Sequence, residues 1–139
     1  MGLDGDPDAD AIAELAGRLA AAIAATDATA AGVATVAGGD VHDDGAPLGV
    51  HTSPDVPGVR SVSVTRRWDS DVPNSAEIEL FGGLSLADVA ARLGAPTHLP
   101  SNPSGRQTVA LEGGEAPATL LAALDDDGLV SAITVLRDG

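Results

Sequence analysis

Apolar and charged residues alternate over residues 76–81, AEIELF, in the clearest pattern of the chain. Because successive side chains of a strand point to opposite faces, this alternation predicts a β-strand with one apolar and one charged face. Glu77 and Glu79 lie on the charged face. The glycines at 82 and 83 predict the end of the strand.

A helix is predicted directly after the glycines, because Leu86, Val89 and Leu93 recur at helical spacing. Ser85 stands at the N-cap position, where a hydroxyl can accept a hydrogen bond from a free backbone amide. Gly94 and a proline two residues further on predict the end of the helix.

Residues 1–7 are predicted to be a mobile acidic N-terminus. A first helix would begin after Asp8 or Asp10 and run to about Ala25. Its buried stripe has helical spacing and consists of Ile12, Leu15, Leu19 and Ile23. Residues 32–37 are apolar and short, and are interpreted as a buried strand.

A second strand is predicted over residues 59–68. Residues 69–75 would turn the chain back into the alternating strand. The resulting hairpin is predicted to place Trp68 opposite Ala76.

In that register Val64 lies opposite Leu80, and Arg67 lies opposite Glu77 as a pair of opposite charges. Arg66 would fall on the apolar face of its strand. We therefore expect either a β-bulge at Arg66 or a position at the edge of the sheet.

The C-terminal part of the chain is predicted to be all strand. Residues 107–112 form one strand, and residues 118–124 and 129–136 form a hairpin. The Asp-Gly pair at 127–128 between two apolar runs is a strong hairpin signal.

Two long irregular loops are predicted at residues 38–58 and 95–106, where glycine, proline or aspartate is frequent. Hairpins are separated by helices without strand–helix–strand alternation. This order predicts a single α+β domain over residues 1–139, with a mostly antiparallel sheet and two helices packed on one face.

The composition permits a core but restricts its chemistry. The chain is 44% hydrophobic and only 1% aromatic, and it has no cysteine, which excludes disulfides and thiolate metal sites. Its beginning lacks the basic and apolar regions of a signal peptide. The alanine-rich run that follows carries Glu14, Arg18 and Asp27, so no membrane span is expected. We expect a cytoplasmic protein.

A formal charge of −14, with no lysine, disfavours a nucleic-acid partner because phosphate binding needs a cationic surface. An acidic surface fits a basic protein as partner. The alternative is that the acidity only serves solvation in a salt-adapted or high-GC organism.

The segment LSLADVAARLGAP resembles the first helix and turn of a LacI-type helix-turn-helix. That resemblance implies a DNA-recognition helix in the next segment. The next segment, APTHLPSNPSG, contains three prolines and cannot form that helix. DNA reading is therefore not expected.

The histidines at 42, 51 and 98 all fall in the two predicted loops. Imidazole and carboxylate groups are ligands of divalent metals, and His42, Asp44 and His51 are the candidate set. Their spacing does not place them on one helical or strand face. Their convergence would depend on the tertiary fold.

No catalytic constellation is evident, since cysteine and a G-x-S-x-G motif are absent and Ser85 is explained as a cap. The sequence therefore predicts a non-catalytic acidic protein-binding module of the immunity, adaptor or secretion-chaperone kind, without a cofactor. Its candidate partner-binding residues are Glu77, Glu79, Arg66 and Arg67. The alternative is a small metal-binding protein or metal-dependent enzyme that uses the histidine and aspartate loops.

Overall fold

The computed structural model describes residues 9–43, 49–53, 56, 58–66, 72–93, 95–98, 107–112, 119–125 and 128–136. The predicted N-terminal segment 1–7 lies outside them. The elements are α1 Ala9–Ala24, α2 Ala30–Ala37, β1 His42–Asp43, β2 Val50–Thr52, β3 Val59–Arg66, β4 Pro73–Leu84, α3 Leu86–Leu93, β5 Ala95–His98, β6 Gln107–Glu112, β7 Thr119–Leu124 and β8 Val130–Leu136.

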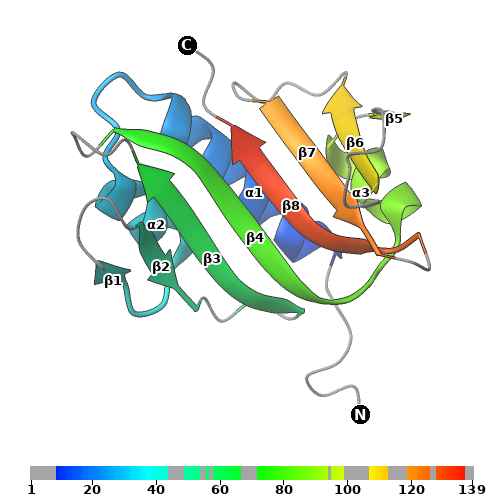
Figure 1. Cartoon of the computed structure of the whole chain (residues 1–139), viewed down its shortest axis with the longest axis horizontal. Helices are drawn as coiled ribbons and strands as arrows, with labels where there is room; N and C mark the ends of the chain where they lie inside the picture. The colour runs from blue at the N-terminus through cyan, green and yellow to red at the C-terminus, as the bar shows by residue number, and fades with distance from the viewer. Residues whose placement is uncertain are drawn as a thin grey trace.

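All the strands of the described part form one sheet in the order β1-β2-β3-β4-β8-β7-β6-β5 (Figure 1). Each ladder is antiparallel. Two four-stranded meanders, β1 to β4 and β5 to β8, are therefore joined along the pair β4–β8. The predicted α+β class, the antiparallel sheet and the C-terminal hairpin are confirmed.

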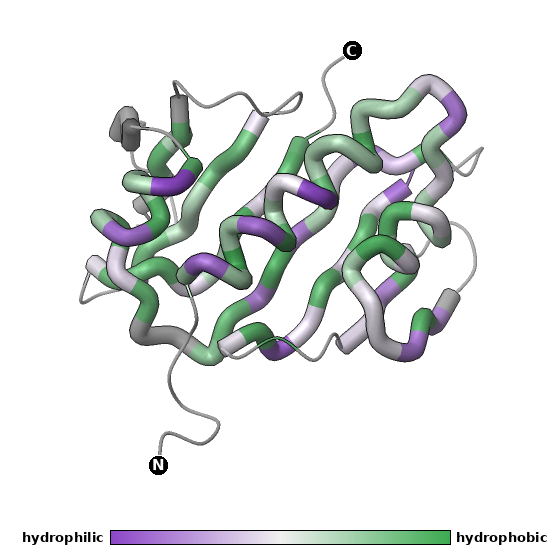
Figure 2. Tube along the Cα trace, turned by 180° about the vertical axis from the view of Figure 1, so that it is seen from behind, coloured by the Kyte–Doolittle hydropathy of each residue, from purple (hydrophilic) through white to green (hydrophobic). Residues whose placement is uncertain are grey.

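The helices cover one face of this sheet and bury its apolar positions. Helix α1 packs against β4 and β8, α2 against β2 and β3, and α3 against β5 and β6. Seen from behind, they lie in front of the strands (Figure 2). The predicted stripe of α1 is confirmed, because Ile12, Leu15, Leu19 and Ile23 are fully buried. They share one hydrophobic cluster with the strands.

The prediction of a strand over residues 32–37 is wrong, because this segment belongs to the helix α2. Thr29 is its N-cap and accepts a 3.0 Å hydrogen bond from the amide of Gly32. The buried positions Ala30, Val33, Ala34 and Ala37 have helical spacing. In the described part of the chain, three helices, rather than the predicted two, therefore cover the sheet.

We expect Thr29→Ala to lower the free energy of unfolding by about 1 kcal/mol, the usual cost of a lost N-cap. The matched control is Thr35→Ala, because the exposed Thr35 hydroxyl only donates back to the Ala31 carbonyl. That change should be neutral or slightly stabilising, since alanine is the better helix former. Urea denaturation measures both. Equal effects of the two variants would contradict the cap.

The predicted register of the β3–β4 hairpin is wrong by four residues. Val64 lies opposite Ala76, and Val62 lies opposite Ile78. The reason is that β4 begins at Pro73, so part of the predicted turn belongs to the strand. The ladder does shift at Arg66, as expected for the predicted bulge.

The predicted end of the alternating strand is also wrong. Strand β4 continues through Gly82 and Gly83 to Leu84, where pairing with β8 resumes opposite Val130 after a register shift. The helix after it is confirmed as α3, with Val89 and Leu93 buried.

Both predicted loops contain strands. Residues 38–58 include β1 and β2, and residues 95–106 begin with β5. Strand β5 contains Pro96 and lies at one edge of the sheet. An edge strand is the place where proline is tolerated, because one side of it makes no ladder hydrogen bonds.

Candidate functional site

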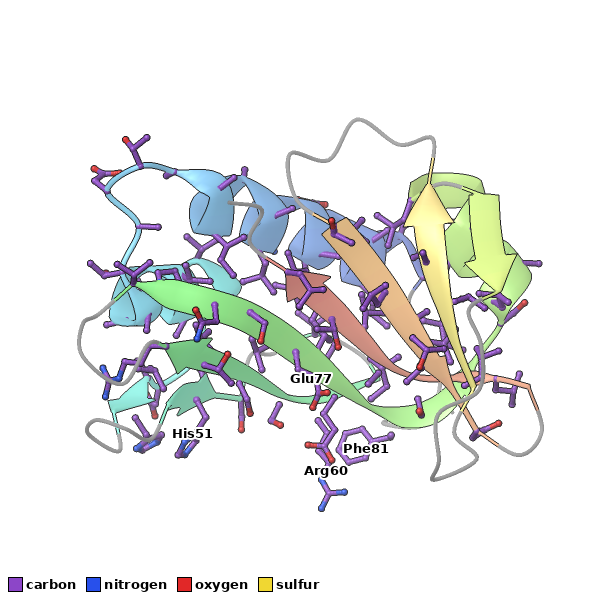
Figure 3. The ribbon with its side chains drawn as sticks, turned by 45° about the horizontal axis from the view of Figure 1, so that its top comes forward. His51, Arg60, Glu77 and Phe81 are labelled. Atoms are coloured by element: carbon purple, nitrogen blue, oxygen red, sulfur yellow. The ribbon has the colours of Figure 1, made fainter. Side chains whose placement is uncertain are left out.

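The face of the sheet opposite the helices, which we call the open face, carries the polar positions of the strands. Alternation buries Val62 and Ile78 under the helices and turns Ser63 and Glu77 to the open face. Figure 3 shows the labelled side chains His51, Arg60, Glu77 and Phe81 on this side and α1 and α2 on the other. None of the helices in the described part lies on the open face.

Strands β3 and β4 build a polar cluster with one aromatic ring on this face. We call it the β3–β4 patch, and it consists of Arg60, Ser61, Ser63, Glu77, Glu79 and Phe81. The Ser61 hydroxyl donates to Glu79 Oε2 at 3.3 Å, and Arg60 Nη1 lies 3.8 Å from Glu79 Oε1. Both members of this ion pair are about half exposed or more, so it contributes little to stability.

A register shift between Val59 and Ser61 sets the position of Arg60. Without the shift, neighbouring residues Arg60 and Ser61 would point to opposite faces. With it, both reach Glu79 on the open face. Bulges commonly redirect side chains at functional surfaces in this way.

Phe81 is the most exposed large apolar residue of the described part, at 65% exposure. Its amide donates to the Gly58 carbonyl at 3.0 Å, so its backbone is held against the start of β3. The sequence contains one phenylalanine and one tryptophan. The protein has few large rings and leaves this one in solvent, and phenylalanine is among the residue types enriched in protein–protein interfaces.

The structure separates the four predicted partner-binding residues. Glu77 and Glu79 are exposed on the open face, as the alternation predicted. Arg66 is only 8% exposed, on the helix side of β3, so it does not share their surface. Arg67 lies outside the described residues. Sequence reasoning missed Arg60, although the adjacent polar residues 60–61 between valines interrupt the alternation and indicate a bulge.

The two histidines predicted in one loop lie in neighbouring strands at the end of the same face. His42 of β1 is directly opposite His51 of β2, and their rings stack with centroids 5.2 Å apart and planes at 22°. Asp44 lies outside the described residues. His98 belongs to β5, at the other edge of the sheet. The described residues contain no group of three or more metal-ligating side chains.

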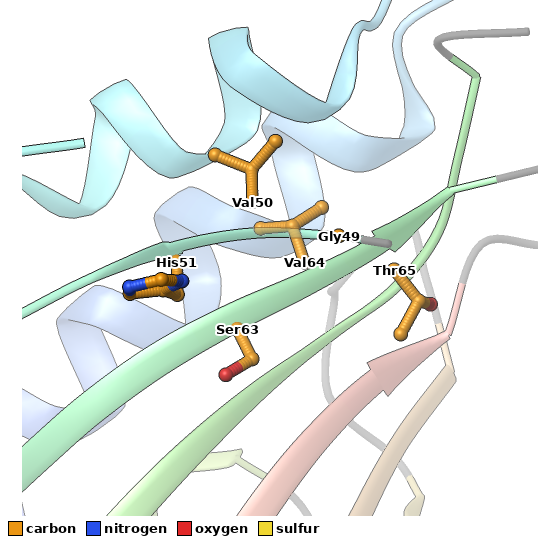
Figure 4. A pocket seen from close by; sticks show the side chains of 6 residues that line it. All are labelled: Gly49, Val50, His51, Ser63, Val64 and Thr65. Atoms are coloured by element: carbon orange, nitrogen blue, oxygen red, sulfur yellow. The ribbon is translucent and has the colours of Figure 1, made fainter. Parts of the chain in front are cut away.

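A small pocket of about 160 Å³ lies beside His51, between β2 and β3. It is lined by Gly49, Val50, His51, Ser63, Val64 and Thr65 (Figure 4). His51, Ser63 and Thr65 supply its polar groups. Together with the β3–β4 patch, the pocket extends the polar surface of the open face to the edge formed by β1 and β2.

These features define an α+β protein with a single antiparallel sheet, one face of which is covered by helices. None of the described helices has both the length and the apolar character needed to cross a membrane. No family model matches the chain, and no curated protein matches it.

Among solved structures, the chain is similar to a DUF4309 family protein, YjgB, from Bacillus subtilis subsp. subtilis str. 168. The similarity covers 91% of this chain and 97% of that chain, with a TM-score of 0.56 and 10% sequence identity. At this identity the likeness concerns the fold alone.

Proposed function

We propose that this protein is a non-catalytic binding module whose open face binds a basic protein. The observation that carries the proposal is the exposed Phe81, which follows Glu77 and Glu79 in one row along β4, on the sheet face that the described helices leave uncovered. An aromatic ring can fill a pocket of a partner, and the carboxylates beside it can pair with cations.

The size of the open face fits a protein partner. The eight strands of the described sheet, spaced about 4.8 Å apart, span roughly 34 Å, and a six-residue strand is about 20 Å long. The product is roughly 700 Å², close to the 800 Å² or so that each partner contributes to an ordinary stable interface. The pocket beside His51 is much smaller than the several hundred Å³ of a typical small-molecule site.

Charge favours a basic partner. The chain has a formal charge of −14, which attracts a cationic protein over a distance and speeds its association at low salt. Arg60 is paired with Glu79, so Glu77 is the carboxylate of the β3–β4 patch better placed for a partner's cation. Binding should weaken as salt screens these charges.

The test is affinity capture from the native lysate with four baits: the natural chain, Phe81→Ala, Glu77→Lys and Glu14→Lys. Glu14 is exposed on α1, on the opposite side of the sheet, so Glu14→Lys makes the same charge change away from the open face. A protein retained by the natural chain and Glu14→Lys should be lost with the other two. With the partner purified, Phe81→Ala should weaken binding by about 30-fold or more, as for a central anchor residue.

A partner that binds all four baits equally would contradict the use of the open face. A partner lost equally with Glu77→Lys and Glu14→Lys would show attraction by net charge alone. The cytoplasmic location and the salt-adapted or high-GC origin stay predictions. The metal-binding alternative is supported by the pair His42–His51.

A further inference from the structure

The pairing of His42 with His51 across β1 and β2 is a structural feature that the binding function does not use. The residues are nine positions apart in the chain, and the antiparallel ladder places them directly opposite each other. Opposed residues of neighbouring strands have Cβ atoms about 5 Å apart. Two imidazole rings on such residues can therefore both reach an ion that lies between them. His42 is exposed and His51 is partly exposed, so an ion can enter from solvent.

The separation of the rings fits a shared ion. When two imidazole nitrogens bind one ion at about 2 Å with a tetrahedral angle between them, the ring centres lie about 5 Å apart. The observed separation is 5.2 Å. Chelation therefore needs a rotation of the rings about their own bonds but no movement of the strands. Each ring uses one nitrogen, and the second nitrogen can keep a hydrogen bond that orients the ring.

We propose that His42 and His51 chelate one divalent transition-metal ion of the zinc class. Imidazole ligands suit zinc, nickel and copper(II), in contrast to magnesium and calcium, which prefer oxygen ligands. The formal charge of −14 draws cations to the protein. Water completes the coordination of an ion held by two histidines at an open edge. This inference does not rest on the proposed function.

The bound ion would join the two strands at the edge of the sheet. Strand β1 has two residues and is held by the pairs His42–His51 and Asp43–Val50. A metal bridge adds a side-chain link to this short ladder. Because the ion binds the folded arrangement, it should also stabilise it, by RT ln(1 + c/Kd), where c is the free ion concentration, and this gain grows with the logarithm of c above Kd.

The experiment is titration of the full chain, free of any histidine tag, with zinc chloride by calorimetry, and with histidine-ring NMR. We expect one zinc per chain. His42→Ala and His51→Ala should each weaken binding by more than about tenfold, because each removes a ligand, and loss of an outer-shell partner of a ligand alone costs about that much. The matched control His98→Ala removes the histidine on the opposite edge and should bind as the natural chain does. The chain has three histidines, so zinc should shift the ring signals of His42 and His51 and leave those of His98 unchanged.

The acidic side chains are the competing ligands, since the chain has 21 of them. If the double variant His42→Ala/His51→Ala keeps the natural affinity for zinc, the ion is held by carboxylates and the proposal is wrong. Equal shifts of all three histidine signals would also overturn it. Both readouts work without knowing a partner. Failure to capture a partner, with zinc binding as expected, would therefore contradict the proposed binding function and leave the zinc site supported.

Discussion

Replacing Ile78 by alanine should lower the free energy of unfolding by about 2–5 kcal/mol, the cost of a large-to-small change in a packed core. Ile78 is fully buried in the central strand β4, where it lies opposite Val62 on one side and Ile133 on the other. Helix α1 covers this region of the sheet. Partial collapse of the cavity would need movement of two strands and a helix, so we expect little relaxation. Urea denaturation followed by circular dichroism measures the effect.

The control for Ile78 is its neighbour Glu77, which points to the open face. Glu77→Ala should change the free energy of unfolding by less than about 0.5 kcal/mol, as for an ordinary surface substitution. If Glu77→Ala were the costlier change, the open face would be part of a core. The proposed binding surface would then lose its basis.

Gly49→Ala should disrupt the sheet where β2 meets β3. A Cβ atom on Gly49 would overlap the carbonyl oxygen of Val64 in the neighbouring strand β3. Backbone cannot yield as a flexible side chain can, so β2 would have to move away from β3. We expect a loss of about 1–3 kcal/mol or more, in the range of overpacked sites. Faster amide exchange in β2, measured by NMR, should accompany it.

Gly17→Ala is the matched control, because it makes the same chemical change in open space. Nothing lies within 4 Å of a Cβ placed on Gly17 in α1. Alanine is the better helix former, so this variant should gain about 0.5–1 kcal/mol. A loss of stability for Gly49→Ala together with a gain for Gly17→Ala would support the close approach of β2 to β3. A stabilising Gly49→Ala would show that the strands are further apart.

The faces of the central strands could be predicted from the sequence, but their pairing could not. A shift of four residues keeps every side chain on its own face, because the period of a strand is two. The prediction that Glu77 is exposed and Ile78 is buried was therefore correct, although the residues predicted to lie opposite them in β3 were wrong. The pattern of apolar residues gave no means to distinguish registers that differ by an even number.

Helix α2 and the histidine pair show two further limits. Helix α2 has eight residues, nearly all of them small and apolar, so neither the helical nor the strand period is visible in its sequence. The N-cap residue Thr29 alone is a weak signal for a helix. Strands β1 and β2 have two and three residues, too few to show alternation. The sequence could indicate His42 and His51 as metal ligands, but only the tertiary pairing of such short strands brings them together.

The order of strands has a consequence for the synthesis of the chain. The last described strand, β8, lies in the middle of the sheet, between β4 and β7. On the ribosome, the twelve residues of β4 are made first and have one unpaired side until residues 130–136 emerge. A long unpaired strand can join the same strand of another nascent chain. The interval between the two strands is therefore the stage at which a chaperone, or slow translation, would most affect the yield of folded protein.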